Sequence, residues 1–300
     1  MSRPIKNVAV TGASGRLGSA VLERLVSSGK FNIKVLRRNG SKSTFALGTQ
    51  VVDVDFESVD SLKAALAGQD AVVAPLGALA LGIQKPLIDA AIAAGVQRFL
   101  PSEFGADLSN SNNRKLPVFA GKVEIADYLV EKAKDTPLTY TVVSNGAFLD
   151  WGLRNRFIID ISEYKPTIFD GGDAIFSTTT LASVGDAVVG ILLHPEETKN
   201  RRVYIEDLKI SQNQLLALAR RVAPGKPWEP QQASLDAATK RSDERLTQGL
   251  FDGETFLPYI YRSMLDPASD GNFQKTDNAL LGLKGKTEED VVELLKQVLN

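Results

Sequence analysis

The sequence predicts an α/β fold: a Rossmann-type, doubly wound parallel sheet followed by a smaller C-terminal α+β domain. Three observations predict it. A strand, a glycine-rich turn and a helix open the chain; short apolar strands then alternate with helical patterns up to residue 144; and this alternation loosens after residue 150. We therefore place one domain at residues 1–150 and a substrate domain at 151–300, with some later segments expected to return to the first sheet.

The first strand is expected at residues 8–10, and three glycines punctuate the turn that follows it. Apolar residues then recur at helical spacing from Leu17 to Leu25. Glycine allows a tight turn and a close backbone approach to phosphate, and a helix N-terminus supplies unpaired N–H groups. The G-x-x-G-x-x-G spacing is a variant of the dinucleotide fingerprint. We therefore expect a pyrophosphate to be held here by Thr11, Gly12, Ser14, Gly15, Arg16, Leu17 and Gly18.

The composition excludes several classes of function. The chain has 300 residues, is 43% hydrophobic, and carries 35 basic and 36 acidic residues for a net charge of −1, so nucleic-acid or membrane-surface binding has no electrostatic support. It has no cysteine and one histidine, which excludes thiolate catalysis and a histidine-cluster metal site. The first strand begins within ten residues of Met1 and no apolar run approaches membrane-spanning length, so we expect a cytoplasmic protein without a signal peptide.

The second strand, expected at residues 32–36, is followed by two arginines, and this position indicates which dinucleotide binds. In a dinucleotide fold this strand end faces the adenosine ribose, where an acidic residue favours NAD and an arginine accommodates the 2′-phosphate of NADP. Arg37 and Arg38 stand here, with Lys42 nearby and no acidic residue at the strand end. We therefore predict NADPH; a solvated basic loop is the alternative.

Three further strands, expected at residues 51–56, 71–76 and 97–100, alternate with helices at 58–67 and 82–94. Ligands bind parallel sheets at the carboxyl ends of the strands. The residues at these ends should therefore contact the cofactor. They are Asp55, Phe56, Leu76, Gly77, Ser102, Glu103 and Phe104, of which Asp55 and Phe56 either flank the adenine or are plain turn residues.

A helix expected at residues 117–134 carries a lysine in the middle of its apolar face. With 100° per residue, the apolar side chains from Val118 to Ala133, Val130 among them, share one arc, and Lys122 lies at its centre. An unpaired buried ammonium is costly, so Lys122 should have a partner or line a cleft, where a lowered pKa suits proton transfer. The alternative is a lysine that extends past the edge of the core.

The same helix contains Tyr128-x-x-x-Lys132, the pattern of short-chain dehydrogenases. Both side chains fall toward the charged face beside Glu124 and Glu131. Pairing along the helix surface explains them there, so we do not expect them to be catalytic.

A sixth strand is expected at residues 138–144, and Asn145 and Phe148 follow its carboxyl end, where nicotinamide and substrate would lie. Later we expect a hairpin at 168–176, helices at 184–193, 211–222 and across 233–265, and a strand at 202–205. Thr287 and Asp290 resemble a capping box, and His194 ends a helix rather than serving catalysis. Aromatic candidates for the wall of a substrate pocket are Phe148, Trp151, Phe157, Phe251, Phe256 and Tyr259.

Taken together, four features resemble the isoflavone reductase-like (NmrA-like) branch of the atypical short-chain dehydrogenases. They are the glycine turn, Arg98-Phe99-Leu100-Pro101-Ser102-Glu103-Phe104-Gly105, Lys122 and Asn145-Gly146-Ala147-Phe148. The resemblance covers residues 5–160 best, and the run from Gly146 to Gly152 is most similar to fungal members. It implies a Rossmann domain, NADPH as cofactor, aromatic secondary metabolites as substrates, and a catalytic lysine at the position of Lys122.

These observations lead to one expected function and two alternatives. We expect an NADPH-dependent reductase that transfers hydride to an aromatic or otherwise apolar small molecule, with Lys122 as general acid/base and with Phe104, Phe148 and Trp151 contacting the substrate. The alternatives are a dinucleotide-sensing regulator without turnover and a non-redox isomerase or cyclase. We expect no metal, no nucleic-acid or membrane partner, and a monomer or homodimer.

Overall fold

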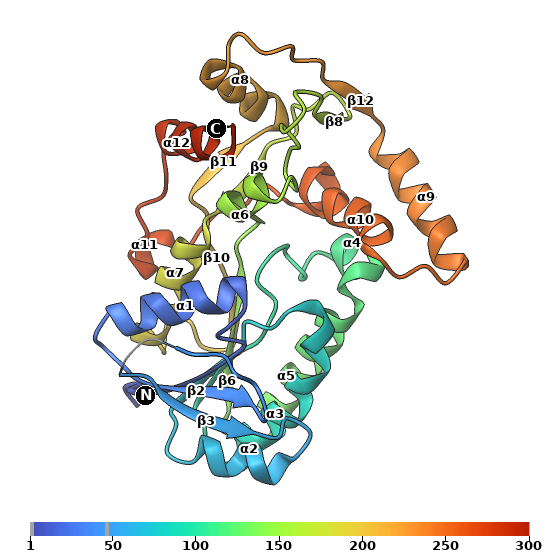
Figure 1. Ribbon diagram of the computed structural model, residues 1–300. Coiled ribbons are helices and arrows are strands. Elements are labelled where there is room, and N and C mark those ends of the chain that lie inside the picture. The colour runs from blue at the N-terminus through green and yellow to red at the C-terminus, as the bar shows by residue number, and fades with distance from the viewer. Residues whose placement is uncertain (1–2, 46–47, 300) are drawn as a thin grey trace.

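Seven parallel strands form the main sheet of the computed structural model, which describes residues 3–45 and 48–299 (Figure 1). Their order is β10-β6-β5-β4-β1-β2-β3. The sheet grows in opposite directions on the two sides of the β1–β4 junction, the switch point at which such folds bind ligands. The strands are β1 (Asn7–Thr11), β2 (Asn32–Arg38), β3 (Gln50–Val54), β4 (Ala71–Val73), β5 (Arg98–Leu100), β6 (Thr139–Ser144) and β10 (Arg201–Tyr204).

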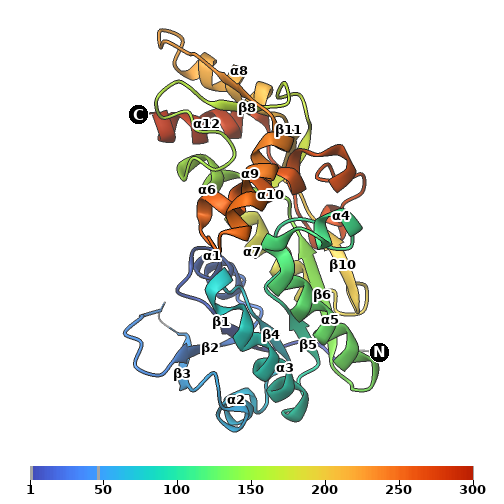
Figure 2. The ribbon, with the colours of Figure 1, turned by 90° about the vertical axis from the view of Figure 1, so that its right-hand side faces the viewer.

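Helices cover both faces of this sheet, so its strands are buried on both sides (Figure 2). Along β1, Val8 and Val10 belong to one core and Ala9 to the other, as the two-residue period of a strand requires. The first face carries α1 (Arg16–Ser27) and α7 (Leu181–Leu193), which pack against each other. The second carries α2 (Val59–Leu66), α3 (Gln84–Ala93) and α5 (Ala120–Lys134).

The C-terminal half builds a second lobe with its own apolar core. Its strands form a three-stranded sheet, β11-β9-β7, and a two-stranded pair, β12-β8. They are β7 (Ala147–Phe148), β8 (Thr167–Phe169), β9 (Phe176–Thr179), β11 (Leu208–Ile210) and β12 (Gln231–Ala233). The helices are α6 (Leu149–Arg154), α8 (Gln212–Val222), α9 (Leu235–Thr247), α10 (Gly253–Leu265) and α12 (Glu288–Leu299). Shorter helical turns are η1 (Ala78–Ile83), α4 (Ser111–Arg114), η2 (Pro117–Phe119), η3 (Pro267–Ser269) and α11 (Asn278–Leu281).

The two lobes share parts of the chain beyond residue 150. Strand β10 lies at the edge of the main sheet, and α7 belongs to its helical layer. The expected capping box before α12 is present, because Thr287 and Asp290 exchange hydrogen bonds of 2.8 and 3.3 Å. No helix in the described part of the chain is both long and apolar enough to cross a membrane.

The expected hairpin at residues 168–176 is wrong. The chain does turn there, with positive φ angles at residues 170–172, but β8 pairs with β12, whereas β9 pairs with β11 and β7. The reason is the contact of this turn with α8. The Asn213 side-chain amide donates to the Gly171 carbonyl at 2.7 Å, and its backbone N–H donates to the Gly172 carbonyl at 3.0 Å. The turn is therefore held by the start of α8, and the two strands on either side of it do not pair with each other.

Three smaller expectations also differ from the structure. Arg37 and Arg38 are the last residues of β2 rather than the first after it. The helix expected from residue 82 begins at Ala78 as a 3₁₀ turn. Val130, expected on the apolar face of its helix, is 38% exposed, because it lies at the border of the buried arc of α5.

Candidate active site

The turn between β1 and α1 is packed so tightly that two of its positions admit only glycine. Gly12 has a φ of +66°, and a Cβ there would lie 2.6 Å from the Pro75 carbonyl oxygen. A Cβ on Gly18 would lie 2.0 Å from the carbonyl oxygen of Gly12, so the helix packs directly on the turn. Among the described residues, no side chain caps the start of α1 at Gly15. The first N–H groups of the helix therefore remain available to an anion.

A groove of about 370 Å³ runs from this turn along the carboxyl ends of the first strands. We call it the nucleotide groove. Seven of the residues expected at the cofactor line it: Thr11, Gly12, Ser14, Arg37, Arg38, Phe56 and Leu76. The groove thus joins the glycine turn to the end of β2, the two places at which the sequence predicts phosphate groups.

The two arginines at the end of β2 are not equivalent. In the register of β2 with β3, Arg37 lies beside Asp53, and their side chains form a two-pronged ion pair at 2.6 and 2.9 Å. Hydrogen bonding within the pair raises the pKa of Arg37 and lowers that of Asp53. Arg38 is exposed and lines the groove. Arg38 is therefore better placed to meet a 2′-phosphate than Arg37.

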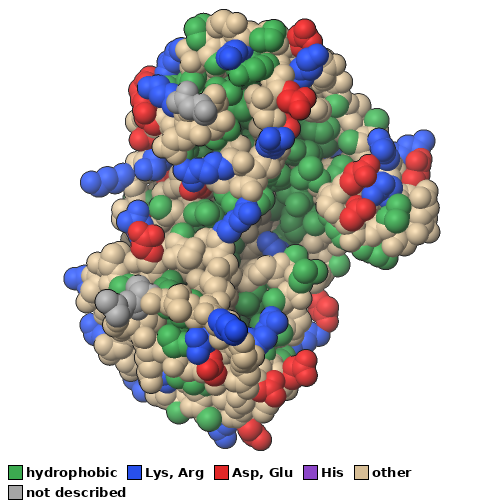
Figure 3. Space-filling model, in the orientation of Figure 1, with side chains coloured by type: hydrophobic (Ala, Val, Ile, Leu, Met, Phe, Trp, Pro, Cys, Tyr) green, Lys and Arg blue, Asp and Glu red, His purple; other side chains and the backbone are tan. Residues whose placement is uncertain are grey.

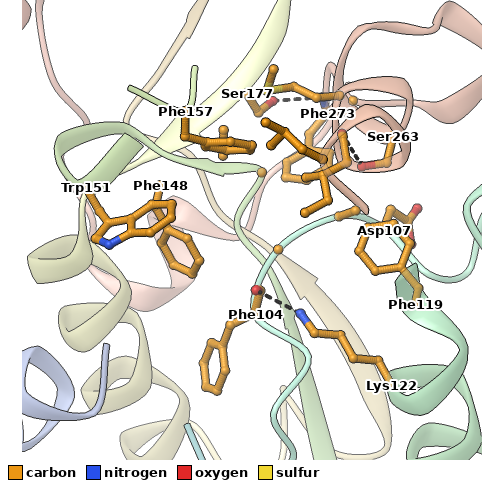
Figure 4. Close-up of a pocket in the computed structure, with 18 residues that line it drawn as sticks. Phe104, Asp107, Phe119, Lys122, Phe148, Trp151, Phe157, Ser177, Ser263 and Phe273 are labelled. Carbon is orange, nitrogen blue, oxygen red and sulfur yellow. Dashed lines mark hydrogen bonds between the residues drawn. The ribbon is translucent and has the colours of Figure 1, made fainter. Parts of the chain in front are cut away.

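A second cavity, of about 270 Å³, lies where the two lobes meet (Figures 3 and 4). We call it the apolar pocket. Aromatic rings from several elements make its wall, and in Figure 4 the labelled rings surround the opening. The expected substrate contacts Phe104, Phe148 and Trp151 all line it. Further apolar side chains in the wall are Phe119, Phe157, Phe273, Leu257, Ile260 and Met264. The polar side chains in the wall are Lys122, Asp107, Ser177 and Ser263.

Lys122 reaches the pocket from the first turn of α5. Its ammonium donates to the backbone carbonyl oxygen of Glu103, and the Phe104 carbonyl oxygen lies 3.5 Å from Nζ (Figure 4). Desolvation lowers the pKa of Lys122 to about 8, with the positive charge of Arg202 acting in the same direction and the charge of Glu103 opposing it. Lys122 is therefore mostly protonated at neutral pH and able to give up its proton.

Three residues expected at the cofactor are held by the protein itself. Ser102 exchanges hydrogen bonds with the backbone of Leu76, at 3.0 and 2.7 Å. Glu103 is 3% exposed, and one of its carboxylate oxygens binds Arg202 at 2.7 Å. Asn145 is fully buried at the end of β6. Its side-chain oxygen and the second carboxylate oxygen of Glu103 are buried without a hydrogen-bond partner among the described residues, and neither residue lines the nucleotide groove or the apolar pocket.

Other residues singled out from the sequence lie outside both cavities. Gly15, Leu17 and Gly18 shape the start of α1, and Arg16 donates to Asn155 of the second lobe at 2.6 Å. Lys42 and Asp55 are exposed beside the groove, and Gly77 precedes η1. Tyr128 and Lys132 both contact Asp89, at 2.7 and 3.4 Å. His194 ends α7, as expected.

Three of the six aromatic candidates for the pocket wall are elsewhere. Phe251 is 71% exposed, and its ring lies 6.4 Å from that of Phe256 at an interplanar angle of 34°. Tyr259 is buried, but its hydroxyl donates to Asp243 at 2.5 Å. Phe256 and Tyr259 lie on α10 and Phe251 precedes it, whereas the residues of this helix that line the pocket include Leu257 and Ile260.

Several groups at the site were not foreseen. Asp53 could have been found, because it stands opposite Arg37 once β2 and β3 are paired in parallel register. Arg202, Asp107 and the pocket residues near Gly271 carry no sequence signal of their own. Among the described residues no group of three or more histidine or acidic side chains is placed to hold a metal ion.

Comparison with known proteins decides the family, because the NmrA-like family model matches residues 4–251. The chain belongs to the NmrA-like family. The NmrA-like resemblance predicted from the sequence is thereby confirmed. Two fungal relatives cover nearly the whole chain: oxidoreductase poxI of Penicillium oxalicum, 32% identical over 95% of this chain and 92% of its own length, and oxidoreductase aprR of Aspergillus flavus, 33% identical over 95% and 97%.

A solved structure supports the same fold. AtPrR2 with NADP⁺ and (+)-pinoresinol superposes with a TM-score of 0.83 over the full length of both chains, at 20% sequence identity. The predicted Rossmann-type fold class is therefore confirmed.

Proposed function

We propose that the protein is an NADPH-dependent oxidoreductase that reduces an aromatic or otherwise apolar small molecule, with Lys122 as the proton donor. The observation that carries this proposal is the position of the Lys122 ammonium. It lies in an aromatic-walled pocket, with its pKa lowered by desolvation, at the same sheet edge as a groove built for phosphate. The names of the fungal relatives, both oxidoreductases, support it.

The residues of the nucleotide groove fit NADPH. The uncapped start of α1 offers N–H groups to a pyrophosphate, and Gly12 and Gly18 let this helix end lie close against the turn, where a Cβ would clash with backbone carbonyls. Arg38 is exposed in the groove and suits a 2′-phosphate. Asn145 lies outside this groove at the end of β6, where its unpaired side-chain oxygen would suit the amide of a nicotinamide. The similar AtPrR2 structure is a complex with NADP⁺, which supports this cofactor.

The chemistry divides between the cofactor and Lys122. When bound, NADPH supplies a hydride from C4 of its nicotinamide to an electrophilic carbon of the substrate. Lys122 holds a proton and donates it to the substrate atom on which negative charge develops. The aromatic wall excludes water and strengthens this interaction. Proton donation of this kind contributes roughly 10²–10⁴-fold to the rate.

The pocket also indicates a substrate class. Its serine and aspartate side chains are occupied: Ser177 donates to Glu206 at 2.7 Å, Ser263 donates to a backbone carbonyl at 2.8 Å, and Asp107 accepts from Ser109 and Tyr204. Lys122 still has a donor to offer, and so has the indole N–H of Trp151, which forms no hydrogen bond within the described residues. We infer a substrate with an aromatic body and an acceptor atom near the reacting carbon.

The test is the Lys122→Met variant, with Lys132→Met as the matched control on the same helix. Lys132 contacts Asp89 at the surface and does not line the pocket. Each protein is incubated with NADPH and a panel of aromatic enones, imines and benzylic ethers, and its affinity for NADPH is measured separately. We expect Lys122→Met to lose about 10²–10⁴-fold in turnover at unchanged NADPH affinity, and Lys132→Met to behave as the parent protein.

The same panel separates the alternatives. Product formed without consumption of NADPH would indicate an isomerase or cyclase, and tight NADPH binding without any turnover would indicate a regulator. Unchanged turnover in Lys122→Met would refute the assignment of Lys122.

A further inference from the structure

A buried ion cluster lies beneath the apolar pocket, and one arginine holds it together. Arg202 of β10 donates to the Glu103 carboxylate at 2.7 Å and to the Ser144 hydroxyl at 2.8 Å, and its Nε lies 3.2 Å from the Asp107 carboxylate. Its side chain is 14% exposed. A single guanidinium therefore links β10, the end of β6 and both ends of residues 103–107.

The 103–107 loop is also the segment that presents hydrogen-bond acceptors to Lys122. The carbonyl oxygens of Glu103 and Phe104 face its ammonium. The backbone between the two carboxylates is unusual, with φ angles of +21° at Phe104 and +155° at Gly105. A non-glycine residue with positive φ persists where surrounding contacts hold it. The bonds from Arg202 to Glu103 and Asp107 are such contacts, one at each end of the unusual segment.

We propose that Arg202 is a positioning residue for Lys122: by binding Glu103 and Asp107 together, it fixes the loop whose carbonyls hold the lysine amine in the pocket. This inference rests on the proposed function of Lys122. Arg202 lies on β10, about 80 residues after Lys122 in the sequence. A residue from the second half of the chain thus helps to position the lysine of the first half. Asp107 lines the same pocket, and its negative charge is balanced by Arg202.

The charges of this cluster make the proposal testable. Glu103 and Arg202 act on the Lys122 ammonium in opposite senses, since the carboxylate favours the charged amine and the guanidinium disfavours it. Replacing Arg202 with Gln should therefore raise the pKa of Lys122, and replacing Glu103 with Gln should lower it. Each change should amount to about one pH unit. If the two residues served only to stabilise the fold, their replacement would not shift the pKa of Lys122 in opposite directions.

The amine can be titrated without knowing the substrate. We would acetylate each protein with a limiting amount of acetic anhydride at a series of pH values and follow the Lys122 peptide by mass spectrometry. The variants are Arg202→Gln, Arg202→Lys and Glu103→Gln. Arg201→Gln is the matched control, because Arg201 stands on the same strand and pairs with Asp277, outside the pocket. Thermal unfolding and NADPH affinity show that each variant is folded.

We expect opposite shifts in Arg202→Gln and Glu103→Gln and no shift in Arg201→Gln. Arg202→Lys keeps the positive charge but loses the guanidinium that binds Glu103 and Asp107 at the same time. In this variant we expect kcat to fall about tenfold at unchanged KM. If Arg202→Gln does not fold, Glu103→Gln and Arg202→Lys still decide the question. A Lys122 titration and a kcat that stay unchanged in these variants would overturn the positioning role. If Lys122→Met kept full turnover, the proposed function itself would fail, whatever these variants show.

Discussion

The exposed arginine at the end of β2 gives a sharp prediction about cofactor choice. Arg37 is held by Asp53, so the charge available to a 2′-phosphate in the nucleotide groove comes from Arg38. A hydrogen bond to a charged group contributes about 1.5–3 kcal/mol, and solvent screening at this exposed position favours the lower end. About 1.5 kcal/mol corresponds to roughly a tenfold change in affinity. We therefore expect Arg38→Ala to bind NADPH about tenfold more weakly.

The assay is a titration of each protein with NADPH and, separately, with NADH, which lacks the 2′-phosphate. NADH affinity should stay within about twofold in Arg38→Ala, because the lost contact is to the 2′-phosphate. Lys42→Ala is the control, since Lys42 is exposed nearby but does not line the groove. If Arg38→Ala weakened the binding of NADPH and NADH equally, or weakened neither, the division of roles between Arg37 and Arg38 would be refuted.

Two more predictions concern Lys122, the proposed proton donor, and the glycine turn. Because the pKa of Lys122 is lowered to about 8, its amine is charged below that pH. If Lys122 donates the proton, kcat/KM should be level below pH 8 and fall about tenfold per pH unit above it; an alkaline limb retained in Lys122→Met would contradict this. Gly18→Ala places a Cβ 2.0 Å from the Gly12 carbonyl oxygen, so it should lower the free energy of unfolding by about 2–3 kcal/mol and weaken NADPH binding. The loss of stability is measured by thermal unfolding. Gly225→Ala is the control, because a Cβ at Gly225 would have no atom within 4 Å beyond its own chain neighbours.

The first half of the fold was predictable because its signals are local. The strands of the main sheet up to β6 contain short apolar runs next to turns, and α1, α2, α3 and α5 fall within the helical patterns. The hairpin expected at residues 168–176 failed for the opposite reason. The turn signal is real, but the pairing of β8 with β12 and of β9 with β11 joins segments about 30 to 60 residues apart, and no local pattern encodes such pairing.

The site shows the same limit. From the position of Lys122 in the middle of an apolar arc we expected either a partner or a cleft; the structure shows both, a backbone carbonyl acceptor and the apolar pocket. The partners of the lysine could not be foreseen. Arg202 reads as an ordinary residue of a strand, and it becomes significant only because β10 pairs with β6 and brings its side chain to Glu103. Long-range strand order, rather than residue type, decides which charges meet.

The kind of acceptor beside Lys122 matters as much as its burial. A carboxylate in direct contact would stabilise the ammonium and hold its pKa high, which makes a poor proton donor near neutral pH. Here the direct acceptors are the uncharged carbonyls of Glu103 and Phe104, while the Glu103 carboxylate is turned toward Arg202. Desolvation can then lower the pKa of the amine, while the carbonyls keep it oriented. The Glu103–Arg202 pair thus separates two tasks, orientation and charge, that a single Lys–Glu contact would combine.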